Sequence, residues 1–318
     1  GLAFCYLAKH FDFGRLTIVA GALVYLFNAF LLYSNVAQPF FTTPFILFPL
    51  IIVALEAVLQ KRSYLPLILV FTWMLINSFY FAYVLGIGAM IYLGLRFLTH
   101  YRQLYYPKDI FQVIFNLGIA TLTSLLCASI MLIPEILAVK NSTRSGGAFA
   151  NGLTLYPPYY YLALPSQLIN GANRDFYFWS ALGFASLAFF ALIYIVGERK
   201  KYPLLFGSFL LSFIMLLFPF FGAVFNGMLA PSNRWTLLTC LPMALAVCCL
   251  IKNSHKLTQK TLKSFTYGLL LYVAYISVTY LFQNDEKLFI PIVFLFIFWS
   301  ILIASNMQNI RSKLPAHL

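Results

Sequence analysis

The stretch "INSFYFAYVLGIGAMIYLGLRF", Ile76–Phe97, decides the membrane topology of the chain. A helix needs about 20 apolar residues to cross the hydrocarbon core of a bilayer, and the apolar part of this stretch is that long. It predicts a transmembrane helix over Phe79–Leu98. The polar residues Asn77 and Ser78 separate this helix from the apolar run before it. We therefore predict that the chain reverses direction at this break.

Apolar runs of the same kind follow one another along the whole chain of 318 residues, which is 62% hydrophobic and 9% charged. This composition excludes an ordinary soluble domain. It predicts an all-α polytopic transmembrane bundle of about eleven helices, forming a single domain over 1–318. The predicted spans are Gly1–Ala8, Leu16–Ser34, Phe41–Leu59, Tyr64–Ile76, Phe79–Leu98, Phe111–Ile133, Phe176–Val196, Leu204–Phe221, Trp235–Ile251, Ser264–Phe282 and Leu288–Ser305.

The beginning of the sequence has no pattern of a cleaved signal peptide. It starts with Gly1 inside an apolar octet, so we expect an internal piece of a longer chain. All five cysteines lie in apolar runs without metal or redox spacing, which favours a packing role. The four histidines are scattered and predict no metal site.

The basic residues assign the two faces of the bundle. With the reversal before Phe79, one face carries 16 of the 21 Lys and Arg residues and the other carries five. The positive-inside rule assigns the richer face to the cytoplasm, so the net charge of +13 requires no nucleic acid partner and is compatible with lipid headgroups. The five outer residues are Lys140, Arg144, Arg174, Arg234 and Lys287.

Two outer loops, 134–175 and 222–235, hold most of the unusual polar residues. In the first, "YPPYYYLALP", Tyr156–Pro165, is too short to span and is expected to lie at the membrane interface. Its rings could anchor there, stack on a sugar or line a lipid path. In the second loop, capping and turn residues suit a helix hairpin, but that role leaves Arg234 unexplained. An arginine near the membrane predicts a phosphate or carboxylate partner.

Carboxylates on the outer face are the weak candidates for catalysis. Glu135 follows Pro134, which is expected to end or kink its helix at the surface. Asp175 begins the next span, where capping the helix is an alternative role. Either carboxylate could deprotonate an acceptor hydroxyl or bind a divalent cation during group transfer. On the inner side, Glu56 is expected to pair with Lys61 and Arg62.

The candidate substrate-binding residues are cations and amides of the same loops. Arginine matches phosphate oxygens with two parallel donors, and asparagine amides can bind carbohydrate hydroxyls. Contact with lipid headgroups is the alternative for the arginines. The residues are Arg144, Arg174, Arg234, Asn226 and Asn233, and they are predicted to surround a phosphate-sugar headgroup together with Glu135 and Asp175.

The segment "FNGMLAPSNRW", Phe225–Trp235, resembles the "NG...NRW" loop of the YfhO family of bacterial membrane proteins. The segments Asn77–Phe97 and Leu132–Gly147, "LIPEILAVKNSTRSGG", support the resemblance, which runs over nearly the whole sequence. It implies a multi-pass protein of the bacterial cell membrane with a GT-C-like fold. The implied activity is transfer of a sugar from a polyprenyl-phosphate donor to a cell-surface polymer such as lipoteichoic acid.

The same resemblance implies that the catalytic acidic residue lies in an outer loop upstream of residue 1. A transporter or flippase of lipid-linked sugars is the alternative function, and a scaffold without chemistry is a third. A transporter would need ionisable or polar residues along its path, and mid-span ionisable residues are almost absent. The sugar, the acceptor and any metal requirement are not encoded in recognisable motifs.

Overall fold

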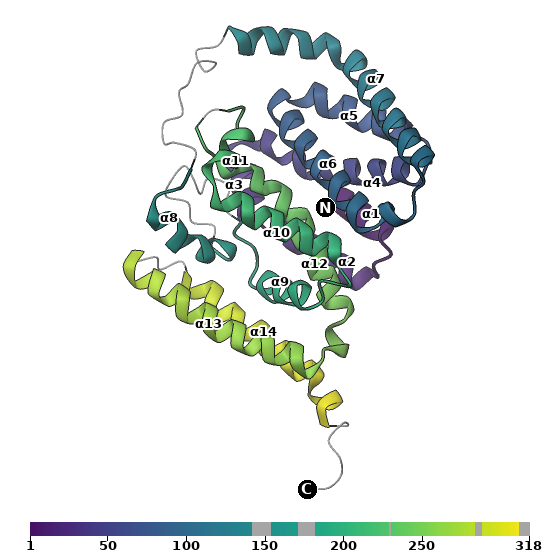
Figure 1. Ribbon diagram of the computed structural model, residues 1–318. Coiled ribbons are helices and arrows are strands. Elements are labelled where there is room, and N and C mark those ends of the chain that lie inside the picture. The colour runs from purple at the N-terminus through teal and green to yellow at the C-terminus, as the bar shows by residue number, and fades with distance from the viewer. Residues whose placement is uncertain (142–153, 171–181, 229, 284–287, 312–318) are drawn as a thin grey trace.

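The computed structural model describes residues 1–141, 154–170, 182–228, 230–283 and 288–311 (Figure 1). Every regular element in these ranges is a helix, as the sequence predicts. The α-helices are α1 (Leu2–His10), α2 (Arg15–Leu26), α3 (Ala29–Ala37), α4 (Pro44–Leu59), α5 (Leu65–Asn77), α6 (Phe79–Thr99), α7 (Pro107–Lys140), α8 (Pro158–Ala163), α9 (Leu187–Gly197), α10 (Pro203–Leu217), α11 (Pro219–Val224), α12 (Cys240–Lys252), α13 (Gln259–Gln283) and α14 (Phe289–Arg311). The 3₁₀ helices are η1 (Pro39–Thr42), η2 (Tyr101–Gln103), η4 (Leu164–Leu168), η6 (Asn233–Thr239) and η7 (Ser254–Lys256).

Several predicted spans are broken helices. Five described segments are long and apolar enough to cross a membrane: Pro39–Leu59, Phe79–Thr99, Pro107–Ala138, Asn233–Lys252 and Phe289–Asn306. The run Leu16–Ser34 is instead divided into α2 and α3 at Asn28, and Leu204–Phe221 is divided into α10 and α11 at Phe218. Eleven uninterrupted spans are therefore too simple a description, although the fold is an all-α membrane bundle.

The helix break at Asn28 is stabilised by its own side chain. Nδ2 of Asn28 donates to the carbonyl of Tyr25 at 2.7 Å, and Oδ1 accepts from the backbone of Leu31 at 2.9 Å. Asn28 is fully buried. Since no water reaches such a site, the side chain supplies the partners that the interrupted helix lacks.

Of the two effects expected of Pro134, an end or a kink, the structure excludes the end. The helix continues through Pro134 to Lys140, so Glu135 lies within a helix and not at its end. Proline removes one backbone donor from a helix, but membrane helices tolerate it where neighbours and local adjustment satisfy the freed carbonyl. Pro49 lies inside α4 in the same way.

Two contacts agree with the predicted reversal at Ser78 and with the predicted grouping of the four loops that they join. Lys61, before α5, forms an ion pair with Asp109, at the start of α7. Nζ of Lys252 donates to the carbonyl of Asp12 at 3.2 Å. All these residues belong to the face that carries the excess of basic residues, here called the basic face. Figure 1 shows the pair α13 and α14 packed beside each other, apart from α5 and α7.

The helix α12 lies at the centre of the bundle, and most of its side chains are buried. It packs closely on α2, where a Cβ on Gly21 would lie 2.4 Å from the sulfur of Cys248 and 3.0 Å from the carbonyl oxygen of Ala244. The thiols of Cys240, Cys248 and Cys249 are buried, which agrees with their predicted packing role. Cys127 on α7 is exposed instead.

A buried ion pair joins α4 to α6 near the basic face. Glu56 is fully buried and bonds Arg96 twice, with Nε at 2.7 Å and Nη2 at 3.1 Å. The hydroxyls of Tyr92 and Tyr101 also donate to this carboxylate. The expected pairing of Glu56 with Lys61 and Arg62 is therefore wrong. The reason is that Glu56 points into the bundle, where Arg96 arrives from α6.

We predict that Arg96→Met lowers the free energy of unfolding by about 3 to 5 kcal/mol, because it leaves a buried carboxylate without its cation. Thermal and denaturant unfolding of the purified protein in detergent would measure this loss. Lys61→Met is the matched control, since it breaks an exposed ion pair and is expected to change stability little. Equal effects of the two variants would contradict a special role for the Glu56 pair.

Candidate functional site

The end of α10 exposes two backbone carbonyls that a neighbouring loop covers. The helix stops at Leu217, because Phe218 is extended and Pro219 has no N–H to continue the hydrogen-bond pattern. The hydroxyl of Tyr160 donates to the carbonyl of Leu216 at 2.8 Å, and that of Tyr161 donates to Leu217 at 2.9 Å. Two tyrosines therefore take the place of the missing backbone donors.

The segment 154–170, which carries these tyrosines, is partly buried in the protein. Tyr160 is fully buried, and Tyr156, Ser166 and Gln167 are also buried. Burial raises the pKa of the Tyr160 hydroxyl, so it remains a neutral donor at physiological pH. The core of "YPPYYYLALP" is therefore packed inside the protein, and its expected position at the membrane interface stays a prediction. Tyr159 alone among its tyrosines is highly exposed, at 43%.

Asn233 connects this segment to the "NRW" motif. Its Nδ2 donates to the hydroxyl of Tyr160 at 3.0 Å. Its Oδ1 accepts from Nε1 of Trp235 at 3.2 Å and from the hydroxyl of Tyr156 at 3.4 Å. Only 3% of Asn233 is exposed. The geometry thus gives Asn233 a structural role, and sugar binding by its amide stays a prediction.

Arg234 reaches side chains of α6 and η1. Its guanidinium carbon lies 5.6 Å from the centre of the Phe41 ring, at cation–π distance. Tyr80, in the first turn of α6, lies near enough for its hydroxyl to interact with the guanidinium. The side chain is half-buried. Arg234 is therefore packed against Phe41 and Tyr80, at the end of the bundle away from the basic face.

The turn before the motif is fixed by Asn226. Its Nδ2 donates to the carbonyl of Ala230 at 2.9 Å and closes the loop. Gly227 and Met228 both have left-handed backbone angles, with φ of +67° and +60°, and the first favours glycine. Gly222 allows a close approach, since a Cβ there would lie 3.0 Å from the hydroxyl of Tyr156.

The predicted constellation is only partly described. Arg144, Arg174 and Asp175 lie outside the described residues. Oε2 of Glu135 is buried, and the described chain offers it no hydrogen-bond partner. The contacts described above for Arg234 and Asn233 are with residues other than Glu135. The roles assigned to these residues, including binding of a phosphate-sugar headgroup, stay predictions.

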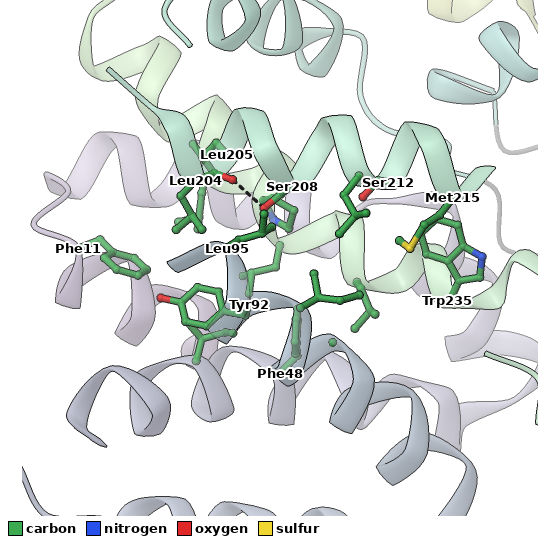
Figure 2. Close-up of a pocket in the computed structure, with 18 residues that line it drawn as sticks. Phe11, Phe48, Tyr92, Leu95, Leu204, Leu205, Ser208, Ser212, Met215 and Trp235 are labelled. Carbon is green, nitrogen blue, oxygen red and sulfur yellow. Dashed lines mark hydrogen bonds between the residues drawn. The ribbon is translucent and has the colours of Figure 1, made fainter. Parts of the chain in front are cut away.

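An apolar groove of about 80 Å³ lies between α4, α6, α10 and α12. Figure 2 shows Phe11 and Tyr92 at one end and Met215 and Trp235 at the other. The groove therefore starts near the basic face and ends beneath the outer motif. Sequence reasoning missed this feature. The signal that could have revealed it is the small residues Gly88, Ser208 and Ser212, the two serines being one helix turn apart on α10.

The described chain contains no group of three or more His, Cys, Asp and Glu side chains that could hold a metal ion. The divalent cation considered for the reaction thus has no ligand set in these ranges. A carboxylate from an outer loop remains the residue type that such an ion would need.

A family model described as "Bacterial membrane protein YfhO" matches residues 1–318. A relative from Bacillus subtilis (strain 168), named "Uncharacterized protein YfhO", is 27% identical over 279 residues. That match covers 86% of this chain but 30% of the relative, so this chain spans less than a third of the relative's length. No solved structure matches the chain. The GT-C-like arrangement therefore stays a prediction.

We predict that Asn233→Ala lowers the free energy of unfolding, because it removes the hydrogen-bond partner of Tyr156, Tyr160 and Trp235. Each buried polar group left without a partner costs about 1 to 3 kcal/mol. Limited proteolysis should cut the segment 154–170 faster in this variant, and the melting temperature should fall. Asn226→Ala is the matched control because it removes one hydrogen bond at a partly exposed turn. Unchanged protection of 154–170 in Asn233→Ala would show that the tyrosines dock without the asparagine.

Proposed function

This chain belongs to the YfhO family of bacterial membrane proteins, and from that premise we propose that the intact protein is a membrane glycosyltransferase. It transfers a sugar from a polyprenyl-phosphate donor to a cell-surface polymer, such as lipoteichoic acid, at the outer face. The observation that carries this proposal is a half-buried arginine beside the outer end of an apolar groove. The arginine would match the phosphate of a lipid, and the apolar groove would match its hydrocarbon part.

Arg234 has the chemistry that the phosphate requires. A guanidinium matches phosphate oxygens and remains charged at all physiological pH values. Phe41 and Tyr80 hold it in place, so little of its rotational freedom is lost when a ligand binds. During transfer, the bond between the anomeric carbon and the phosphate oxygen breaks, and negative charge collects on the lipid phosphate. A fixed cation stabilises the transition state, in which this charge develops, more than it stabilises the ground state.

The acceptor half of the reaction needs a base. The acceptor hydroxyl oxygen forms the new bond to the anomeric carbon, and its proton passes to a carboxylate. Glu135 is the described carboxylate with the most suitable chemistry, since one of its oxygens is buried without a described partner. Asp175 is the second candidate by sequence. The transfer leaves a glycosylated polymer and a free polyprenyl phosphate, so no oxidant or reductant is required.

The groove lining favours transfer over transport of the sugar headgroup. A flippase needs polar groups along the path of its sugar. The hydroxyl of Tyr92 donates to Glu56, and Ser208 donates to the carbonyl of Leu204 at 2.9 Å. Nε1 of Trp235 donates to Asn233. These polar groups are occupied inside the protein, which suits a hydrocarbon chain better than a sugar.

We predict that Arg234→Ala in the full-length protein lowers sugar transfer on the order of a hundredfold, as expected for loss of one fixed charge-stabilising group. Arg234→Lys should retain more activity, because it keeps the charge and loses the planar donors. Transfer would be measured in membranes with a radiolabelled polyprenyl-phosphate sugar and the isolated polymer.

Arg199→Ala on the exposed basic face is the matched control and should leave transfer unchanged. Melting curves of each variant would separate misfolding from loss of chemistry. If cells that lack the gene keep every surface glycan, or if folded Arg234→Ala protein transfers sugar normally, the proposed function is wrong.

A further inference from the structure

We infer that Pro242 and two threonines keep the segment Asn233–Thr239 as the 3₁₀ helix η6, and that this helix type positions Arg234. The role of Arg234 rests on the proposed function, whereas the helix type is tested without it. η6 has seven residues, but the other 3₁₀ helices of the described chain have three to five. Runs beyond about four residues are uncommon, because their hydrogen-bond geometry is poorer than that of an α-helix. A specific cause must therefore hold η6 in this form.

One row of η6 is polar and supports the helix itself. Residues three apart lie above one another in a 3₁₀ helix, which places Asn233, Thr236 and Thr239 in one row. The hydroxyl of Thr236 donates to the carbonyl of Asn233 at 2.7 Å. The hydroxyl of Thr239 donates to the carbonyl of Thr236 at 2.6 Å. Each hydroxyl bonds the carbonyl three residues back, which is the carbonyl that a 3₁₀ backbone bond also uses, so the row favours this helix type.

A second row of η6 is apolar and faces the groove. Trp235, Leu238 and Leu241 line the groove, again at intervals of three residues. Leu238 fits closely onto α6 at Gly88, where a Cβ would lie 2.8 Å from one of its methyl groups. In an α-helix, with about 3.6 residues per turn, these three side chains would spread around the axis. Packing in the groove therefore also favours the 3₁₀ form.

Pro242 opposes an extension of α12 back over this segment. It is the third residue of α12, within the first turn, where a proline is tolerated. In an α-helix that began at Asn233, Pro242 would lie in the interior, and its ring would press on the carbonyl of Leu238, four residues back. The backbone changes from 3₁₀ to α at Cys240 instead, which keeps the proline near the helix start.

The helix type decides where Arg234 lies. The helix α12 is fixed by its close contact with α2, where a Cβ on Gly21 would lie 2.4 Å from the sulfur of Cys248. Six residues separate Arg234 from Cys240, at which α12 begins. Over six residues an α-helix rises about 3 Å less than a 3₁₀ helix and turns about 120° less. In an α form, Arg234 would therefore be drawn toward the middle of the bundle and rotated away from Phe41.

The 3₁₀ form gives each residue of the "NRW" motif its own surroundings. Asn233 bonds Tyr160, Arg234 contacts the Phe41 ring, and Trp235 lines the groove. A turn of about 120° per residue separates three consecutive side chains evenly around the axis. The proline and the two threonines are therefore positioning residues, which act through Arg234.

The test uses full-length protein in phosphatidylglycerol nanodiscs and electron cryo-microscopy of two variants. The alanine variant carries Thr236→Ala, Thr239→Ala and Pro242→Ala, which remove the hydroxyls and the proline and supply the best helix former. We expect α-helical hydrogen bonds from residue 233 onward and a guanidinium displaced from the Phe41 ring. The matched control, Thr236→Ser with Thr239→Ser, keeps the hydroxyls and the proline and should retain η6 with Arg234 in place.

Two structural results would overturn the inference. One is a 3₁₀ helix that persists in the alanine variant, and the other is an α-helix that forms there but leaves Arg234 against Phe41. Melting curves show whether each variant is folded. If the alanine variant does not fold, Pro242→Ala alone decides: α-helical bonds at Leu238 and Thr239 support the inference, and an unchanged η6 overturns it.

The transfer assay separates this inference from the proposed function. Sugar transfer should fall on the order of a hundredfold in the alanine variant, as in Arg234→Ala. Combining the two sets of substitutions should lower transfer no further, because both act through one guanidinium. Losses that add would show that the alanine variant acts elsewhere, which overturns the positioning role. If Arg234 moves and transfer is unchanged, the positioning stands and the proposed function of Arg234 is wrong.

Discussion

The constraint on which this structure depends is that backbone polar groups in a membrane must find partners within the protein. Its helices break at several points near the outer face, and each break exposes N–H or C=O groups that water cannot reach. Side chains satisfy them: Asn28 caps the start of α3, and Tyr160 and Tyr161 bond the last carbonyls of α10. Polar residues in this oily chain are therefore placed where the helices are interrupted.

This constraint separates the residues of the "NRW" motif by role. Asn233 and Trp235 bond each other and the tyrosines, so they hold the outer loops together. Arg234 instead reaches Tyr80 and Phe41. Adjacent residues on a tight helix point in different directions, so a short motif can combine an anchor with a recognition group. A glycosyltransferase needs both, because a cation stabilises a leaving phosphate best when it is already held in place.

The sequence predicted those features that depend on composition and charge. Hydropathy identified the helices, and the distribution of Lys and Arg identified the reversal at Ser78 and the grouping of the loops. It did not predict which polar residues turn inward. Glu56 pairs with Arg96, 40 residues away, and Tyr160 bonds α10, 56 residues away, because tertiary contacts decide partners that local spacing cannot show. The groove was missed for the same reason, since its walls come from four separate helices.

The docking of the tyrosine loop has a mechanical consequence. Tyr160 bonds the carbonyl of Leu216, and the preceding residue, Met215, is part of the groove wall. The loop and this wall of the groove are therefore connected through the end of α10. By thermodynamic reciprocity, a ligand that favours one position of this helix at either end changes the affinity of the other end by the same factor.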